Sequence, residues 1–410
     1  MHPKATARMK ELVLEALATL ELKKGRLEGV SAFKVLEPLG DFIRKQYGQW
    51  LRDEVAEFYA LLMIQQQLET RGSLNRDGVL ADVTTIEQRK EIAQALVDAW
   101  TAVPIEYRFV FPVPGMKNVE REVEIAPGVV FTNVDRDEVD SLGMTMTLSF
   151  GELAGVVPTS KVAALVVRER GLMMLESTTE VPAVAAIRKA KITLLLGVVV
   201  GVFAVSATTF DAPKFVTYTP SGGPGAVSGR VNLSPGFAKA LCSIAVVRHG
   251  SLVLTHPIFA ETMTCVGSVL AREGGKQQQP VEEQCARVAT AAEWLFDAEF
   301  DGESATQFVQ AAIALEALYG GGADEPIRNT LSNRVAYSLG KTHEQREDLR
   351  TFIHEFYDTR SRVVHRGATR LDGTQRQQLD RARQVLHQAL NHELRMVGTA
   401  DTGAARAQRV

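Results

Sequence analysis

The chain has 410 residues, of which 45% are hydrophobic and 23% charged, and its formal net charge is −3 at pH 7. This balance is typical of soluble globular domains, and it excludes a wholly disordered chain, a collagen-like fibre and a disulfide-stabilised miniprotein. The length predicts two or three domains. The three cysteines are widely spaced and form no CxxC pair, so we expect a protein of the reducing cytoplasm.

The first hundred residues have a helical pattern. Apolar residues recur at helical spacing over 9–20, 36–43 and about 50–70. Thr84 followed by Glu87 predicts a capping box for a further helix that reaches Trp100. We therefore predict a helical N-terminal region over residues 1–103.

From Pro104 the pattern changes to an alternation of apolar and charged residues, which is typical of half-buried strands. The alternating segments are 105–111 and 119–125, and 129–131 and 144–150 are shorter strand candidates. We expect the first two segments to form a hairpin through Pro112–Asn118. The glycine- and proline-rich stretch Thr219–Gly236 predicts a loop. Residues 104–273 are thus predicted to form a mixed α/β region.

One apolar segment raises the question of a membrane span. Ile192–Phe210 contains 19 residues without a charge, which is close to the length that crosses a bilayer. Glycine, serine and threonine interrupt it, and its strongly apolar part is confined to Leu194–Val205. We therefore favour a buried core helix or strand and expect no membrane partner. A membrane-linked effector is kept as an alternative.

After the linker Gly274–Pro280 the pattern is helical almost to the end. Helices are predicted over about 281–300, 304–319, 326–339, 345–365 and 374–397. They predict an all-α domain over residues 281–397, followed by a flexible tail at 398–410. The predicted fold class is therefore α+β: an N-terminal mixed helical and β region, followed by a C-terminal all-α helical bundle.

Charge is unevenly distributed along the chain. From Arg360 to Val410 there are ten arginines, no lysine and four acidic residues, a net charge of +6, which leaves −9 on the rest. An arginine-rich end on an acidic body predicts a surface that faces phosphates. A solvated basic helix face is the alternative.

Several common catalytic motifs are absent from the sequence. There is no GxxxxGK[ST] loop, no HExxH zinc motif, no GxSxG elbow and no dinucleotide-binding glycine pattern. His354, Asp358 and His365 share one helix face, but about 10 Å of helical rise separates the last two, which is too far for one ion. We expect no metal and no cofactor.

The predicted helix 345–365 carries the most informative pattern. At about 100° per residue, an apolar stripe expected to face the core contains Leu349, Phe352, Ile353, Phe356, Val363 and Val364. Arg360 falls inside this stripe. A guanidinium there needs an anion or a well-bonded partner, so we expect Arg360 to be held at a helix interface. Outward snorkelling and a structural pair with Glu316 are the alternatives.

His365 lies about 140° from Arg360 around an ideal helix. The two side chains converge if the helix ends near His365, which Gly367 permits, or if a two-fold axis brings two copies of the helix together. A histidine that merely favours the helix C-terminus is the alternative.

These residues resemble a known family. The run Tyr357–Gly367 (YDTRSRVVHRG) resembles the R-x4-6-H motif of HEPN domains, and the segments 311–320 and 331–336 resemble the helices that precede that motif. Together they are similar to the ApeA-like HEPN branch of prokaryotic phage-defence type. The resemblance covers Ala305–Gly367 and extends more loosely to about Arg395.

The resemblance implies a HEPN-like helical bundle that forms a homodimer through the C-terminal helical domain and cleaves RNA without a metal. The implied catalytic residues are Arg360, which holds the phosphate, and His365, which acts as general acid or base in a composite site. It also implies an antiviral, toxin-like effector whose N-terminal region senses a phage or nucleic-acid trigger.

Further residues near the motif are expected to support the site or bind RNA. They are Asp358, Ser361, Arg362, Arg366 and, as a further backbone contact, Arg370. The alternatives are a solvated helix face for the arginines and a plain surface acid for Asp358. Ser361 departs from the Asn, Asp or His that often follows the family's arginine. It motivates the alternative function: a non-catalytic module for dimerisation or for nucleotide or RNA binding, which regulates a partner.

Overall fold

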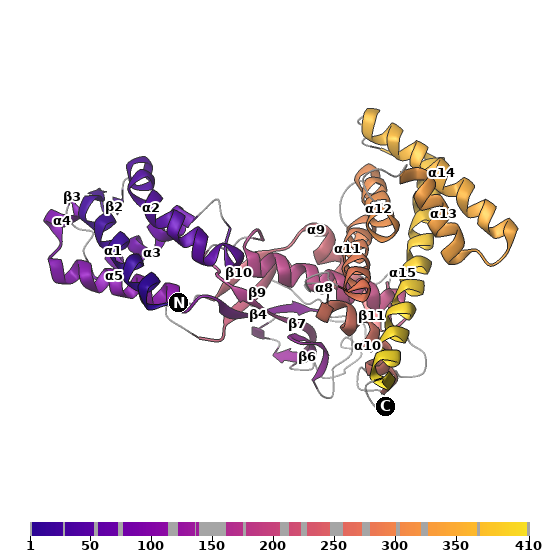
Figure 1. The fold of residues 1–410 in the computed structure, drawn as a ribbon, viewed down its shortest axis with the longest axis horizontal. Helices are drawn as coiled ribbons and strands as arrows, with labels where there is room; N and C mark the ends of the chain where they lie inside the picture. The colour runs from indigo at the N-terminus through magenta and orange to yellow at the C-terminus, as the bar shows by residue number, and fades with distance from the viewer. Residues whose placement is uncertain are drawn as a thin grey trace, which may run out of the picture. The chain divides into compact units, whose positions relative to one another are not determined.

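The computed structural model describes residues 2–27, 29–52, 56–72, 77–113, 122–135, 137–138, 161–174, 178–205, 213–222, 228–246, 257–272, 279–300, 304–320, 327–366 and 370–407. Figure 1 labels most of the helices and strands. The chain divides into two compact units. Unit 1 comprises Met1–Phe109, Arg168–Ala185 and Thr217–Val231, and unit 2 comprises Val110–Val167, Ala186–Val216 and Asn232–Val410.

The first part of unit 1 is mainly helical, as predicted. Its helices are α1 (Pro3–Thr19), α2 (Gly29–Tyr47), α3 (Ala56–Thr70), α4 (Leu80–Val83) and α5 (Ile86–Thr101), and a 3-10 turn, η1 (Gly48–Trp50), follows α2. A small antiparallel sheet, β2-β1-β3, accompanies them and was not predicted. Its strands are β1 (Glu21–Lys23), β2 (Arg26–Leu27) and β3 (Gly78–Val79). Strands of two or three residues are too short to show an alternation of apolar and polar residues in the sequence.

The capping box of α5 lies one residue later than predicted. Thr85 is the N-cap, and it exchanges hydrogen bonds with Gln88. The hydroxyl of Thr84 instead donates to the carbonyl of Leu80. The prediction was wrong because Thr84 with Glu87 and Thr85 with Gln88 both fit the capping-box pattern.

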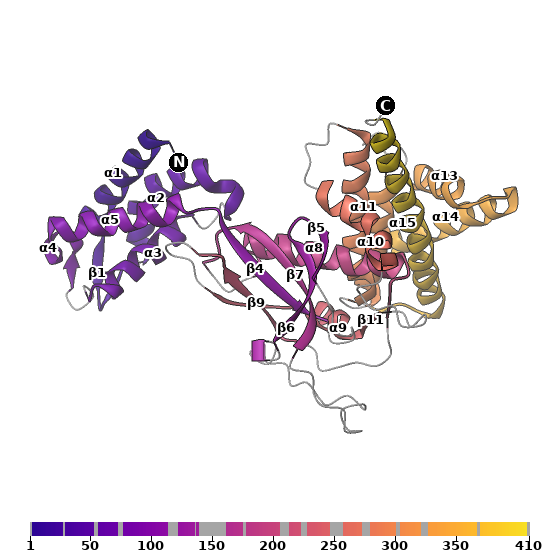
Figure 2. The same ribbon diagram turned by 90° about the horizontal axis from the view of Figure 1, so that it is seen from below.

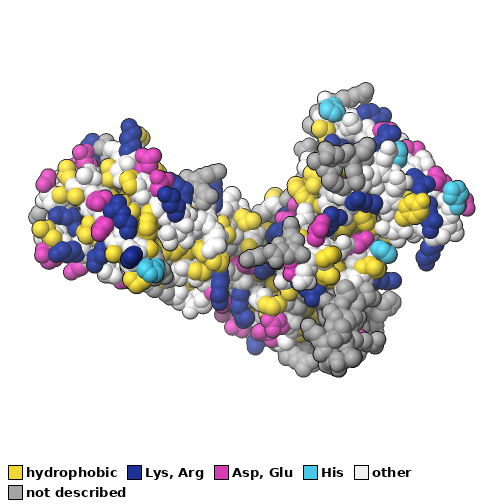
Figure 3. Space-filling model, in the orientation of Figure 1, with side chains coloured by type: hydrophobic (Ala, Val, Ile, Leu, Met, Phe, Trp, Pro, Cys, Tyr) yellow, Lys and Arg dark blue, Asp and Glu magenta, His cyan; other side chains and the backbone are white. Residues whose placement is uncertain are grey.

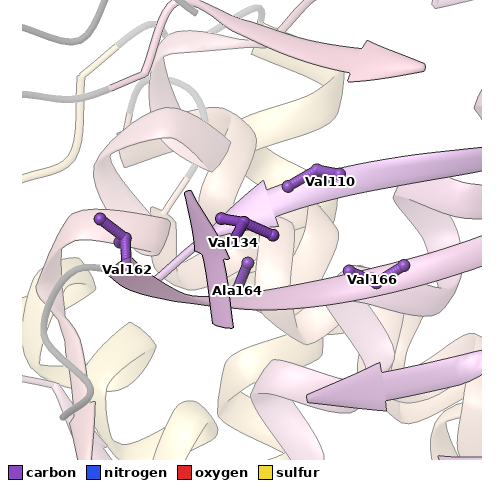
Figure 4. Close-up of a cluster of buried hydrophobic side chains, with 5 residues drawn as sticks. All are labelled: Val110, Val134, Val162, Ala164 and Val166. Carbon is purple, nitrogen blue, oxygen red and sulfur yellow. The ribbon is translucent and has the colours of Figure 1, made fainter. Parts of the chain in front are cut away.

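The main sheet has six strands in the order β10-β9-β4-β7-β6-β5. Figure 2 labels β9, β4, β7, β6 and β5 of this sheet. The strands are β4 (Ile105–Pro112), β5 (Val123–Ala126), β6 (Val129–Asp135), β7 (Lys161–Gly171), β9 (Phe215–Pro220) and β10 (Gly229–Asn232). β6 and β7 pair antiparallel over their shared length. On one part of this sheet the apolar side chains of β4, β6 and β7 form a buried cluster: Val110, Val134, Val162, Ala164 and Val166 (Figure 4).

The predicted hairpin of 105–111 with 119–125 is wrong. β4 lies between β9 and β7, and β5 pairs with β6 at the edge of the sheet. Alternation of apolar residues identifies a strand but does not choose its neighbour. Residues 114–121 and the strand candidate 144–150 lie outside the described residues.

The predicted loop Thr219–Gly236 is also wrong in part. It contains the end of β9, all of β10 and the first residues of α9 (Pro235–Ser243). Ser234 caps α9, and Pro235 occupies its first position, so serine and proline mark the start of a helix here rather than a loop.

The apolar segment Ile192–Phe210 divides between a helix and a strand. α8 (Val181–Val199) ends before Gly201, and β8 (Phe203–Val205) pairs with β11 (Ile244–Val246). Leu194, Leu195 and Leu196 are completely buried, which confirms the prediction of core packing for this part; residues 206–212 lie outside the described ranges. Among the helices that the structure describes, none combines the length and apolarity needed to cross a membrane.

The C-terminal part consists of helices, and all five predicted ones are present. After α10 (Pro257–Arg272) come α11 (Pro280–Phe300), α12 (Ser304–Tyr319), α13 (Ile327–Leu339), α14 (His343–Arg366) and α15 (Gly373–Ala407). α15 extends through the segment predicted as a flexible tail as far as residue 407. Alanines, which favour helices, recur in this stretch. Residues 273–278, most of the predicted linker, and residues 408–410 are not described.

The chain is therefore a mixed α+β protein with an N-terminal β-containing region followed by helices. The predicted division at residues 103 and 273 differs from the two compact units, because strands β4, β7, β9 and β10 and helix α8 each contribute residues to both. Within unit 2, α8 is joined to α11 by the ion pairs Arg188–Glu293 at 2.8 Å and Lys191–Asp297 at 2.6 Å.

Candidate functional site

Most of the site residues predicted from the sequence lie on α14, which packs against α12 and α13. A capping box begins this helix: the backbone N–H of Gln345 donates to the Thr342 hydroxyl, and the Gln345 side chain accepts from the Thr342 N–H. The apolar stripe buries Phe352, Ile353, Phe356 and Val363, as predicted. Val364 was expected in the stripe but is 44% exposed, so the buried stripe is narrower than predicted near the end of the helix.

Arg360 is half-buried between α14 and α12. Its Nη2 atom lies 3.9 Å from Oε1 of Glu316, and the two side chains are 32% and 26% exposed. At this distance the two groups form an ion pair, but they are too far apart for a hydrogen bond. The Nε atom of Arg360 is buried and has no hydrogen-bond partner among the described residues. The guanidinium is therefore positioned beside a carboxylate while it retains unused donors.

Tyr357 holds that carboxylate in place from the preceding turn of α14. Its hydroxyl donates to Oε1 of Glu316 at 3.0 Å and lies 3.3 Å from the carbonyl oxygen of Ala312. Burial and the neighbouring Glu316 raise the pKa of Tyr357 above its usual range, and the charge of Arg360 opposes this only in part. Tyr357 is thus a neutral donor near pH 7. The sequence named Glu316 as an alternative partner of Arg360, but a role for the Tyr357 hydroxyl was missed, although its spacing of three residues from Arg360 was visible.

His365 lies on a different face of α14. The helix continues to Arg366 without a break, so the five residues from Arg360 to His365 rotate by about 140° and rise by about 7.5 Å. His365 is exposed and, within the described part of the chain, makes no hydrogen bond or ion pair. The helix ends one residue after His365, and because His365 still lies within it, this end does not by itself turn the imidazole toward Arg360.

Asp358 and Arg362 are engaged in contacts near the end of α14. The carboxylate of Asp358 pairs with Arg328 on α13 at 2.5 Å, and both side chains are largely exposed. Arg362 donates to the Thr359 hydroxyl at 3.0 Å and to the Asp358 carbonyl at 3.3 Å. These bonds fold Arg362 back along its own helix. The carboxylate of Asp358 faces α13, and among the described residues it makes no contact with His365.

The remaining predicted residues are on the surface or not described. Ser361 and Arg370 are exposed, and the side chain of Arg366 lies outside the described part of the structure. On the face in Figure 3, basic, acidic and histidine side chains are mixed over the C-terminal helices. Among the described side chains on this face, charges of both signs are therefore interspersed.

The metal alternative has no support among the described residues. Nε2 of His354 lies 3.1 Å from the Ser332 hydroxyl on α13, and Asp358 is paired with Arg328. No group of three or more His, Cys, Asp or Glu side chains that could hold a metal ion occurs in the described ranges.

Comparison of the chain with protein-family models, curated proteins and solved structures found no match. The function of this chain is therefore inferred from the site itself. Its chemical content is a guanidinium with unused donors beside a fixed carboxylate, and an exposed imidazole about one and a half turns further along the same helix.

Proposed function

We propose that this protein is a metal-independent endoribonuclease of the HEPN type. In this proposal Arg360 holds the scissile phosphate, and His365 is the general acid or base. The observation that carries the proposal is the state of Arg360: it is half-buried at a helix interface and its buried Nε is unbonded among the described residues. Such a group gains most from a phosphate, whose oxygens accept charge-assisted hydrogen bonds from a guanidinium.

The active species of this proposal is a homodimer. Since Arg360 and His365 face about 140° apart on one helix, a working pair requires a second copy of α14. The end of α14 offers a surface for it: Val364 is 44% and Ile327, at the start of α13, is 43% exposed. The Arg328–Asp358 pair puts the start of α13 beside the last turns of α14. Exposed apolar side chains beside an exposed imidazole fit a two-fold contact.

The chemistry follows from the substrate. RNA carries its own nucleophile, the 2′-OH beside the scissile phosphate. His365 of one copy removes that proton as O2′ bonds to phosphorus, and the protonated His365 of the second copy donates to O5′ as the P–O5′ bond breaks. Arg360 stabilises the negative charge that builds on the phosphate oxygens. The products are a 2′,3′-cyclic phosphate and a 5′-hydroxyl end.

The test is the analysis of product ends. Purified protein incubated with RNA in EDTA is expected to give 2′,3′-cyclic phosphate ends, detected by mass spectrometry. A strand with 2′-deoxy sugars throughout is expected to remain intact, because it lacks the nucleophile. Products with 3′-hydroxyl ends, or cleavage that depends on a divalent cation, would refute the mechanism.

One observation favours the second candidate, a non-catalytic module for dimerisation or for nucleotide or RNA binding. Glu316 lies beside Arg360 and competes with a phosphate for the guanidinium. In that case the protein dimerises and binds RNA tightly, but no product forms under any condition that triggers its cellular effect.

The wider role that we propose is phage defence, with the N-terminal region as the sensor of a phage or nucleic-acid trigger. Bacteria that express the protein are then expected to stop growing on infection, and to do so only when Arg360 and His365 are intact. Equal protection by wild-type protein and by Arg360→Ala would refute this role.

A further inference from the structure

A tyrosine is unusually exposed on α13, away from the end of α14 that carries Arg360. Tyr337 has 63% of its surface accessible, the highest value among the exposed aromatic residues of the described chain. It lies two residues before the end of α13, at the tip of the hairpin that α13 and α14 form (Figure 1). Large aromatic side chains left this open often mark contact surfaces.

Two arginines of α14 contact the ring of Tyr337. The guanidinium carbon of Arg346 lies 5.1 Å from the ring centroid, and that of Arg350 lies 5.3 Å from it. Because these arginines are one helical turn apart, both approach from the α14 side. The rest of the ring is left to solvent.

Hydrogen bonds fix both arginines in position. Nε of Arg346 donates to the carbonyl of Gly340 at 2.9 Å, and Nε of Arg350 donates to Oδ1 of Asn333 at 3.0 Å. The aromatic ring and its two guanidinium groups are therefore held before any ligand arrives, which lowers the entropy cost of binding.

The charge balance at the tip leaves positive groups available. Three acidic residues lie nearby: Glu344, Glu347 and Asp348. Glu347 pairs with Arg350, and Asp348 pairs with Arg381 at 2.5 Å. Arg346 and Lys341 have no ion pair within the described residues, and Glu344 is the acid that remains. Cations beside an open aromatic ring match the two parts of a nucleotide, a flat base and a phosphate.

We propose that Tyr337, Arg346 and Arg350 form a stacking platform for an unpaired base of single-stranded RNA. This proposal rests on the proposed ribonuclease function and specifies its substrate as single-stranded. Bases stack on aromatic side chains when they are unpaired, whereas the bases of a duplex are already stacked on each other. Arg350 precedes Arg360 by ten residues, about 15 Å along α14. One strand can therefore reach both places.

The experiment measures binding with the full-length chain in a background that cannot cleave, Arg360→Ala with His365→Ala. A fluorescent single-stranded RNA of twelve adenosines is titrated by anisotropy, alone or annealed to its complement. Loss of one base stack predicts that Tyr337→Ala weakens single-strand binding by about tenfold, within a range of about 5- to 150-fold. Tyr337→Leu should weaken it similarly, and Tyr337→Phe should bind within twofold of the parent.

Matched variants make the result specific. Met396→Ala, which changes another exposed apolar side chain, should leave binding unchanged, and circular dichroism should show that each variant is folded. Equal affinity of the parent and Tyr337→Ala, the same loss in Tyr337→Phe as in Tyr337→Ala, or an equal loss for the duplex would overturn the platform. The absence of any RNA binding would also overturn the platform. It would indicate that Tyr337 at the tip of the α13–α14 hairpin contacts a protein partner instead.

The two proposals can fail separately. If Tyr337→Ala weakens binding but the wild-type protein yields no cyclic-phosphate ends, the platform stands and the nuclease proposal fails. If the wild-type protein cleaves RNA and Tyr337→Ala has the same KM and kcat, the platform fails and the nuclease proposal stands.

Discussion

Arg360 and Glu316 face each other across α14 and α12, with 3.9 Å between Nη2 and Oε1 and with both side chains open to solvent in part. A pair with this distance and exposure contributes at most about 1 kcal/mol to stability. The fold therefore does not depend on the charge of Arg360, and the guanidinium is available to a ligand.

The first prediction concerns the coupling between these two residues. In a double-mutant cycle of Arg360→Ala and Glu316→Ala, the coupling free energy of unfolding should be below about 1 kcal/mol, because solvent screens the pair. Urea denaturation of the four proteins measures it. A coupling of about 3 kcal/mol or more would show that Arg360 is a structural partner of Glu316, and it would remove the main support for a phosphate site.

The second prediction concerns the surface for the second copy. Val364→Asp places a charge among the exposed apolar residues near His365, so it should weaken the homodimer by tenfold or more and lower RNA cleavage in parallel. Val30→Asp is the matched control, since Val30 is 82% exposed on α2. Sedimentation velocity measures the dimerisation, and the RNA products resolved on a gel measure the cleavage. A wild-type chain that remains monomeric at micromolar concentration would contradict the composite site and the non-catalytic alternative together.

The third prediction concerns the packing of α10 on β5. A Cβ at Gly267 would lie 2.0 Å from the backbone oxygen of Ile125, whereas a Cβ at Gly373 has nothing within 4 Å. Gly267→Ala should therefore lower the thermal unfolding midpoint by several degrees, because backbone must move. Gly373→Ala should leave it unchanged or raise it slightly. Equal midpoints for the two variants would show that α10 does not approach β5 as described.

The fourth prediction concerns acid stability in unit 1. The Arg44 guanidinium, 2.7 Å from Glu57, holds the pKa of Glu57 below its usual value of 4.5. The ion pair between Glu57 and Arg44 therefore contributes fully to stability above pH 4.5. This contribution is lost as the pH falls through the lower pKa that Glu57 has in the folded state. Glu57→Gln should flatten this part of the stability curve, measured by urea denaturation between pH 3 and 6. An unchanged slope would mean that the ion pair does not persist in solution.

The sequence predicted the local elements of the C-terminal part well because each helix there has a strong apolar period. Phe352, Ile353 and Phe356 recur at helical spacing, and they are buried as expected. Val364 is exposed although it shares this helical period, because the buried stripe narrows at the end of α14. The final residues of α15 are helical although few apolar residues mark a face there.

The pairing of strands that are distant in the chain could not be predicted from the sequence. Alternation identified β4, which ends at Pro112, but its neighbours β7 and β9 begin only at Lys161 and Phe215. No local pattern encodes that choice. The division into two units was missed for the same reason, because its boundaries fall inside strands and α8.

The candidate site was predictable in its residues and less so in its geometry. The helical period placed Arg360 at an interface and named Glu316 among its possible partners, and the structure has this contact. The hydrogen bond from the Tyr357 hydroxyl to Glu316 depends on how α14 packs against α12. A single sequence does not specify that packing. The sequence also gave no sign of the exposed ring of Tyr337.

The most direct test of the ribonuclease proposal is the cleavage of RNA in EDTA by wild-type protein and four variants. Arg360→Ala and His365→Ala should each lower the cleavage rate by at least a hundredfold while folding and dimerisation are retained. The controls Arg395→Ala and His392→Ala on α15 should cleave like wild type. Cleavage that survives in both Arg360→Ala and His365→Ala would contradict the account.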